Sequence, residues 1–223
     1  MGIVNVKAIE LVFDWNIWPR HSVQRLDGTN IARMKEALRN GYPLPPPVVA
    51  TDMRIVDGFH RVKARMSVFG DMSEIDVFMK EYPDDAAMVL EAGTLNWVHG
   101  LKMSPQDKAH FIIKCRSLKI PPAVIASALY TDTASMKEFL KKRTARTASG
   151  EQIALPRGAQ ALAGKKLTKA QEHFVRTATG TLPEMYAQML INALRAEALM
   201  LTDKSIAKLE ELRDLIDTVL EEV

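Results

Sequence analysis

Hydrophobic and polar positions follow one pattern up to about Pro83 and a different one beyond it. In the first part, short runs of β-branched and apolar residues alternate with stretches of helical periodicity. The short runs predict strands at residues 4–13, 48–50, 54–56 and 75–79. The helical spacing predicts helices at residues 28–40 and 60–68, which are closed by Gly41 and Gly70. This part is therefore expected to be an α+β domain.

Beyond Pro83 the strand signals end, and helical periodicity continues nearly to the end of the chain. One helix has a clear beginning, because Ser104 is a good N-cap and Pro105 follows at the first helical position. The predicted helices cover residues 84–98, 104–118, a stretch from 123, another after 131 or 132, 167–178, 183–200 and a last stretch from 203. Residues 144–158 are rich in Thr, Ser, Ala and Gly and are predicted to be a linker. The second part is therefore expected to be all helical.

The last predicted helix carries an apolar stripe with helical spacing. A stripe of this kind packs either within its own domain or against a second copy of the chain. Its members are Ile206, Leu209, Leu212, Leu215 or Ile216, and Val219 or Leu220.

The composition is that of an ordinary globular protein. Of the 223 residues, 47% are hydrophobic and 26% are charged, which excludes the disordered and fibrous classes. No apolar run approaches the roughly 18 residues of a membrane span, and the N-terminus lacks the layout of a signal peptide. We therefore expect a cytoplasmic protein without a membrane partner. The single cysteine, Cys115, stands in a helical pattern and is expected to be a core residue.

The distribution of charge is more informative than the net charge of +3. Basic residues dominate the segment from Lys137 to Lys169, whose acidic residues are Glu138 and Glu151. Such asymmetry is typical of a binding surface for a polyanion, although a solvated helix surface has a similar composition.

A glycine joins a predicted strand to a predicted helix within the segment Asp57-Gly58-Phe59-His60-Arg61. Glycine permits a tight turn here and leaves the first amides of the helix directed at an anion. Arg61 falls in the first helical turn, where its guanidinium can bind phosphate oxygens bidentately. A purely structural turn is the alternative.

Asp57 and His60 are candidates for further chemistry in this loop. His60 can contact a phosphate, hydrogen-bond the loop or transfer protons near neutral pH, and we favour the first two roles over catalysis. Asp57 can hold Arg20, cap the helix or meet a metal ion. No His or Cys cluster has the spacing of a zinc site, so the question of a metal stays open.

Residues 121–142 have the features of a helix-turn-helix. Ala126 is the small residue at the crossing, Tyr130 and Thr131 form a turn without the usual glycine, and Met136 is the buried residue of the second helix. A helical pair that merely packs is the alternative. In the DNA-binding interpretation, groove-facing residues are followed by residues near phosphates. The full set is Thr133, Ser135, Lys137, Lys141, Lys142, Arg143 and Arg146.

An ordered set of motifs runs through residues 4–100. It consists of Trp18-Pro19-Arg20, the helix and glycine at 31–41, Leu44-Pro45-Pro46-Pro47-Val48, the loop from Ile55 to Ala64, and Leu95-Asn96-Trp97-Val98-His99-Gly100. Together these motifs resemble the N-terminal domain of the ParB family, which shares a fold with sulfiredoxin. ParB-like proteins place a helix-turn-helix directly after the Asn-containing helix, and this chain has its candidate at that position.

The resemblance implies an α+β ParB/sulfiredoxin-like domain followed by an all-α helix-turn-helix and a C-terminal helical region. The implied domains are 1–100 for nucleotide or phosphate binding, 101–148 for DNA binding, and 149–223 for dimerisation or partner binding. The implied ligand is a nucleoside triphosphate, CTP or ATP, with magnesium. Its implied contacts are Arg20, Gly58, Phe59, His60, Arg61, Asn96 and His99.

Departures from the family pattern leave the nucleotide and the metal open. ParB clamps carry Gly-Glu-Arg-Arg where this chain has Gly-Phe-His-Arg, and Leu95 and His99 replace a Glu and an Arg of the later element. The sulfiredoxin version has a cysteine in place of Phe59, so the nucleophile of that chemistry is missing. Sulfiredoxin activity is therefore not expected.

We accordingly expect a ParB-like protein that couples nucleotide binding to binding of double-stranded DNA, as a homodimer with at most weak NTPase activity. Its role would be plasmid or chromosome partition, or a function of a phage or mobile element. Two alternatives stay open. The same fold could cut DNA or hydrolyse nucleotide through Asp57 and Asp76, or the helices could bind another protein as an adaptor.

Overall fold

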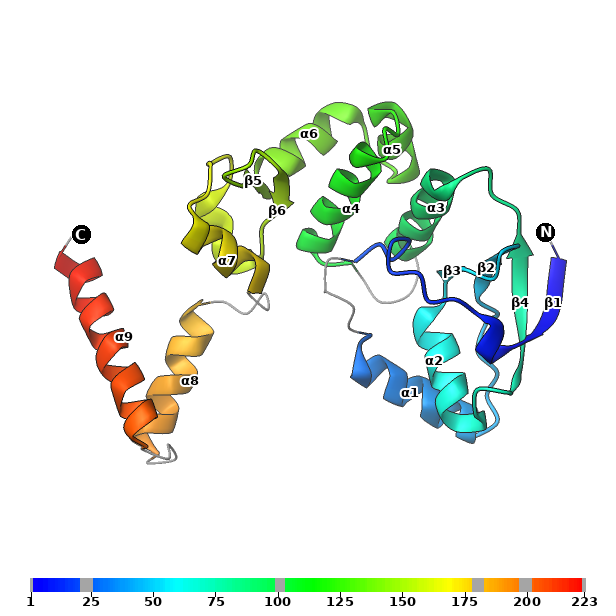
Figure 1. Cartoon of the computed structure of the whole chain (residues 1–223), viewed down its shortest axis with the longest axis horizontal. Helices are drawn as coiled ribbons and strands as arrows, with labels where there is room; N and C mark the ends of the chain where they lie inside the picture. Colours follow the sequence, from blue (N-terminus) through cyan, green and yellow to red (C-terminus); the bar gives the residue numbers. More distant parts are fainter. Residues whose placement is uncertain (1, 21–25, 99–102, 178–182, 197–201, 222–223) are drawn as a thin grey trace. The chain divides into compact units, whose positions relative to one another are not determined.

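The computed structural model describes residues 2–20, 26–98, 103–177, 183–196 and 202–221. The chain divides into two compact units, Met1–Thr179 and Gly180–Val223. The first unit contains all the strands of the described residues, and the second contains helices α8 and α9 (Figure 1).

A four-stranded mixed sheet organises the beginning of the chain. Its strands are β1 (Gly2–Lys7), β4 (Glu74–Lys80), β2 (Val48–Ala50) and β3 (Ile55–Asp57), in that spatial order. β4 pairs antiparallel with β1 and parallel with β2, and β2 pairs antiparallel with β3. The mixed α and β character expected from the sequence is confirmed. The first predicted strand is shorter than expected, because a short 3-10 helix, η1 (Ala8–Glu10), follows β1 directly.

Helices cover both faces of this sheet. Side chains alternate along each strand, so apolar side chains point to both faces and each face forms a core with a helix. Val49 and Ile55 belong to the core that α2 (Phe59–Phe69) completes with Phe59 and Val62. On the opposite face, the core members from the strands are Val48, Ala50 and Val56, and those from α3 (Asp85–Val98) are Met88 and Ala92. Helix α1 (Gly28–Arg39) packs against α2 (Figure 1). β3 therefore lies between α2 on one face of the sheet and α3 on the other.

Helices α3, α4 (Pro105–Ser117), α5 (Pro122–Ala128) and α6 (Thr133–Lys141) share a third core. α4 begins as predicted, with Ser104 as its N-cap and reciprocal hydrogen bonds between Ser104 and Asp107. α3 and α4 approach closely at Gly93, where an added Cβ would lie 2.0 Å from the ring of Phe111. Cys115 is fully buried in this core, and burial raises its pKa to about 12.

The expectation of an all-helical second part is wrong, because the predicted linker contains a β-hairpin. Strand β5 (Thr144–Arg146) pairs antiparallel with β6 (Gln152–Ala154), and Gly150 takes a positive φ of 89° in the turn between them. Each strand has only three residues, so its alternation is too short to be recognised in the sequence. The predicted boundary between residues 148 and 149 falls inside this hairpin.

A small fourth core includes side chains of the hairpin. It joins the hairpin to η2 (Arg157–Leu162) and α7 (Lys169–Thr177) through the side chains of Ala145, Ile153, Leu155, Ala159, Leu167 and Val175. The second unit has α8 (Pro183–Arg195) and α9 (Asp203–Glu221), and α9 has no buried residue. None of the helices in the described ranges is long and apolar enough to cross a membrane.

Candidate phosphate-binding and DNA-binding sites

Gly58 makes the turn from β3 into α2, and glycine is required there for two reasons. Its φ of 106° lies in a region that side chains rarely adopt. An added Cβ would also lie 2.6 Å from Cβ of Pro47 and 3.0 Å from the guanidinium of Arg61. The backbone of the loop therefore lies directly against both the proline run and the arginine.

The N-terminus of α2 keeps its first amides available. No side chain caps this end, and the first helical hydrogen bond runs from the Val62 amide to the Gly58 carbonyl. Among the described residues, none accepts a hydrogen bond from the amides of Phe59, His60 or Arg61. Amides of this kind at a helix N-terminus, together with the helix dipole, favour an anion.

Phe59, which was predicted as a nucleotide contact, has its side chain in the protein core. It is 1% exposed and contacts the rings of Phe13, Trp15 and Trp18. The side chain thus anchors the loop in the aromatic core, and only the backbone amide of Phe59 could take part in the predicted contact.

Arg61 connects the loop to the proline run. Its guanidinium donates to the carbonyls of Pro45 and Pro46, at 2.9 Å each, and forms an ion pair of 2.5 Å with Asp57. The side chain also borders a pocket of about 380 Å³, which the proline run, Arg65 and Asp76 line on other sides.

Asp57 links three elements through its two carboxylate oxygens. One oxygen accepts from Arg61, and the other accepts from the side-chain amide of Asn96 on α3 at 3.2 Å. Asn96 in turn accepts from Arg20 at 3.4 Å, and the Arg20 guanidinium lies 4.0 Å from the Asp107 carboxylate on α4. The predicted residues Arg20, Asp57, Arg61 and Asn96 therefore form one connected network.

Arg20 and His60 are both buried beside this network. Burial lowers the pKa of Arg20, whereas the carboxylates of Asp107, Asp57 and Asp27 act in the opposite direction. Burial, and secondly the charge of Arg20, lower the pKa of His60. Its Nε2 atom accepts a hydrogen bond of 2.9 Å from the Asp27 amide, so the imidazole is neutral. His60 thereby holds the beginning of α1 against α2.

The carboxylates considered for a nuclease do not form a metal cluster. In the residues that the structure describes, no group of three His, Cys, Asp or Glu side chains is arranged to hold a metal ion. Asp76 lies on β4 and accepts from Asn5 of β1 at 2.8 Å. His99, which was predicted as a nucleotide contact, lies outside the described residues.

The helix-turn-helix candidate is a packed pair of helices. Ala126 and Leu129 from α5 and Met136 and Leu140 from α6 are all buried in the same core. Tyr130 takes the positive φ of 53° that a glycine usually provides in this turn. Asp132 caps α6 by accepting from the amides of Ala134 and Ser135.

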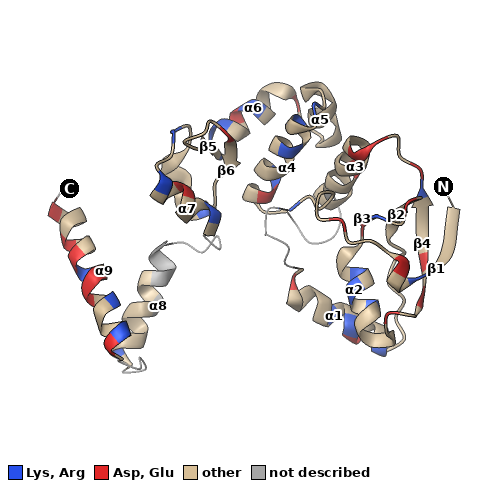
Figure 2. Ribbon diagram, viewed as in Figure 1, with Lys and Arg blue, Asp and Glu red and all other residues tan. Residues whose placement is uncertain are grey.

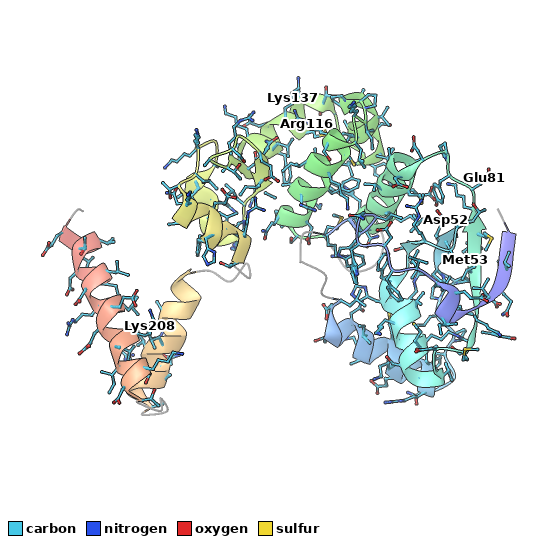
Figure 3. All side chains as sticks on the ribbon, viewed as in Figure 1. Asp52, Met53, Glu81, Arg116, Lys137 and Lys208 are labelled. Carbon is cyan, nitrogen blue, oxygen red and sulfur yellow. The ribbon has the colours of Figure 1, made fainter. Side chains whose placement is uncertain are left out.

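The predicted DNA-facing residues lie on α6 and just beyond it. Ser135 donates its hydroxyl to Asp132, and Lys142 forms a surface ion pair with Glu138. Arg146 donates to the Gly150 carbonyl in the hairpin turn. Lys137, Lys141, Lys142 and Arg146 are exposed, whereas Thr133 and Arg143 are half-buried. Lys137 lies at the outer edge of α6 in Figure 3, and Figure 2 shows basic residues along α6 and near β5.

Several residues that sequence reasoning missed hold these sites together. Asp27 bonds His60, and Asp107 pairs with Arg20. Lys114 of α4 donates to the carbonyl of Trp18, which ties the segment before Arg20 to the helical core. Asp27 caps α1 and Asp107 belongs to the capping box of α4, but the partner of each is remote along the chain.

No protein-family model matches this chain, and no curated protein matches it. Similar solved structures include the pNOB8-like ParB N-domain, with a TM-score of 0.43 and 13% identity over 69% of this chain and 53% of that chain. The C-terminally truncated partitioning protein ParB from Caulobacter crescentus is similar in two complexes. With the centromeric parS site the TM-score is 0.45 at 14% identity, covering 62% of this chain and 70% of that chain. With CTP-gamma-S the TM-score is 0.36 at 15% identity, covering 86% and 99%.

The chain spans about half the length of the pNOB8-like structures, at 56% and 53% of those chains.

Proposed function

We propose that this chain is a ParB-like DNA-binding protein whose first domain binds the phosphates of a nucleoside triphosphate at the Gly58 loop. The observation that carries the proposal is a series of side-chain contacts that runs from that loop to α4. Asp57 contacts Asn96, and Asn96 contacts Arg20. Arg20 lies near Asp107, which belongs to the capping box of α4. An anion that draws Arg61 away from Asp57 would change this network and bias the position of the DNA-binding helices.

The loop suits a phosphate in its hydrogen-bond donors and its charge. The available amides of residues 59–61 and the dipole of α2 favour an anion at this end of the helix. The Nε–H of Arg61 makes none of the bonds to Pro45, Pro46 and Asp57, so it stays available to a phosphate oxygen. The pocket beside Arg61 offers room for the rest of the ligand, for which we propose CTP or ATP with magnesium.

We propose α6 as the helix that enters the major groove of double-stranded DNA. Its exposed lysines follow a capped N-terminus, and its apolar side is fixed by the core shared with α5. This arrangement separates residues that contact bases from residues that contact phosphates. The role is DNA partition or a function of a phage or mobile element, carried out by a homodimer.

Isothermal titration calorimetry with CTP, ATP and GTP, each with and without magnesium, tests the nucleotide site. Arg61→Ala should weaken binding of the preferred nucleotide at least tenfold, because the bidentate cation is lost. Lys63→Ala is the matched control, since Lys63 is exposed on the same helix. Unchanged binding in folded Arg61→Ala would overturn the proposal, as would no binding by the wild type.

Arg61 also tethers the proline run, so circular dichroism has to accompany the titration. If Arg61→Ala is unfolded, nucleotide binding is measured with Arg61→Lys instead, because lysine keeps the charge without the planar fork of the guanidinium.

A plasmid-cleavage assay tests the enzyme alternative. Plasmid is incubated with magnesium or manganese and either the wild type or Asp57→Asn. Cleavage that Asp57→Asn abolishes would favour a nuclease.

A further inference from the structure

The basic middle of the chain does not end with α6. Residues 164–167 lie beside β5 on the edge opposite β6, with hydrogen bonds from the Arg146 amide to the Lys165 carbonyl and from the Leu167 amide to the Arg146 carbonyl. These bonds, of 2.9 and 2.8 Å, bring Lys165 and Lys166 next to Arg146 although about twenty residues separate them in sequence. We call β5, β6 and residues 164–167 the wing.

The wing is fixed to the helix-turn-helix. Directly at the end of α6, the Thr144 hydroxyl donates to the Leu140 carbonyl, and the Leu155 amide donates to the Arg143 carbonyl. On α4, Arg116 donates to the side chain of Gln152 at 3.3 Å. Ala154 also belongs to the core of α3 to α6. The wing therefore holds a defined position relative to the exposed lysines of α6.

Arg146 and Lys166 lie on the same face of the wing. They are bridge partners, and paired residues on neighbouring strands point to the same side. The residues beside them in sequence, Ala145 and Leu167, point to the opposite side and are buried in the core with α7. Arg146, Lys165 and Lys166 are exposed.

Like charges placed side by side on neighbouring strands are destabilising unless an anion accompanies them. Glu151, in the turn between β5 and β6, already pairs with Arg176 of α7 at 3.1 Å. Within the described ranges, Arg146, Lys165 and Lys166 take part in no ion pair. The wing thus presents an unneutralised positive surface next to the end of α6.

We propose that the wing is a second contact to duplex DNA, in which Arg146 and Lys166, on one face of the wing, bind backbone phosphates beside the groove that α6 enters. This inference rests on the DNA-binding function proposed above. Duplex DNA fits because its phosphates are regularly spaced along both edges of the groove, and a rigid element joined to α6 meets one of those edges.

The first test compares Arg146→Ala/Lys166→Ala with Arg33→Ala/Arg39→Ala. The control arginines are exposed on α1, and neither forms an ion pair among the described residues. Fluorescence anisotropy with a labelled duplex is measured over a range of salt concentrations. The wing variant should bind about tenfold more weakly near 0.1 M salt, with a salt slope smaller by about 2. The control variant should match the wild type.

The second test maps the wing on the DNA. A DNA-cleaving chelate is attached to Ala148→Cys, in the exposed turn of the hairpin; the native Cys115 is fully buried and does not compete for the label. Cleavage of the backbone on one flank of each half-site is expected. The same label on Ala32→Cys of α1, also exposed, should give no such flank-specific cleavage.

The outcomes separate this inference from the function on which it rests. A wild type that binds duplex DNA while the wing variant keeps the same affinity and salt slope would overturn the wing and leave the DNA-binding function standing. A wild type that binds no duplex at low salt would overturn both. Tighter binding to single-stranded RNA than to duplex DNA would overturn the assignment of the ligand.

Discussion

At the scale of residues, each position of the loop from Asp57 to Arg61 has its own structural role. Gly58 gives the backbone a conformation and a close approach that a side chain would prevent. Phe59 fixes the loop to an aromatic core, and His60 ties α2 to the beginning of α1. Arg61 is held at the loop surface by Asp57 and two proline carbonyls. Each of these loop residues is thus tied to a neighbouring element before any ligand arrives.

Gly58→Ala should lower the free energy of unfolding by about 2 kcal/mol or more, because it adds a steric clash with Pro47 to the strain of a positive φ. Gly41→Ala isolates the second effect, since Gly41 has a φ of 77° and nothing within 4 Å of an added Cβ. That control should lose only about 1 kcal/mol. Urea denaturation measures both, and equal losses would contradict the close approach at Gly58.

At the scale of elements, α6 combines a buried apolar side with an exposed polar one. Met136 and Leu140 are buried, whereas Lys137, Lys141 and Lys142 are exposed. The ion pair of Lys142 with Glu138 joins two exposed side chains, and such pairs contribute little to stability. Lys142 can therefore exchange this partner for a phosphate at little cost.

Lys141→Ala/Lys142→Ala should weaken DNA binding by a similar factor at all sequences and reduce the salt slope by about 2, because phosphate contacts carry no sequence information. Anisotropy titrations with two unrelated duplexes at several salt concentrations measure both quantities. An unaltered slope, or a loss confined to one sequence, would count against phosphate contacts at these lysines.

At the scale of the whole molecule, the two units of the chain differ in the burial of their apolar side chains. The first unit buries its apolar side chains in several cores, whereas α9 of the second unit has none buried. On α9, the side chains of Leu212, Ile216 and Val219 are 39%, 47% and 58% exposed. With Leu209 they repeat at steps of three and four residues, which is the spacing of a helix-pairing seam.

We predict that this seam joins two copies of the chain, so that Leu212→Ser/Ile216→Ser shifts the protein from dimer to monomer at micromolar concentration. Glu210→Ser/Asp217→Ser, on exposed polar positions of the same helix, should leave the dimer intact. Sedimentation velocity measures the masses. A monomeric wild type would contradict the prediction.

The sequence by itself determined the elements that have strong local signals. Ser104 and Pro105 predicted the beginning of α4, and glycines predicted the ends of α1 and α2, because caps and turns depend on residues close together in the chain. The same local signal identified Gly58 and Arg61 as a candidate site.

Only the tertiary structure decided which remote residues meet. It brought Asn96 and Arg20 to Asp57, paired His60 with the amide of Asp27, and turned the side chain of Phe59 into the core. It also made a hairpin of a predicted linker and placed Lys166 beside Arg146. The physical reason is the same in each case: strand pairing and side-chain networks are stabilised by partners far apart in sequence, so no short window of residues contains them.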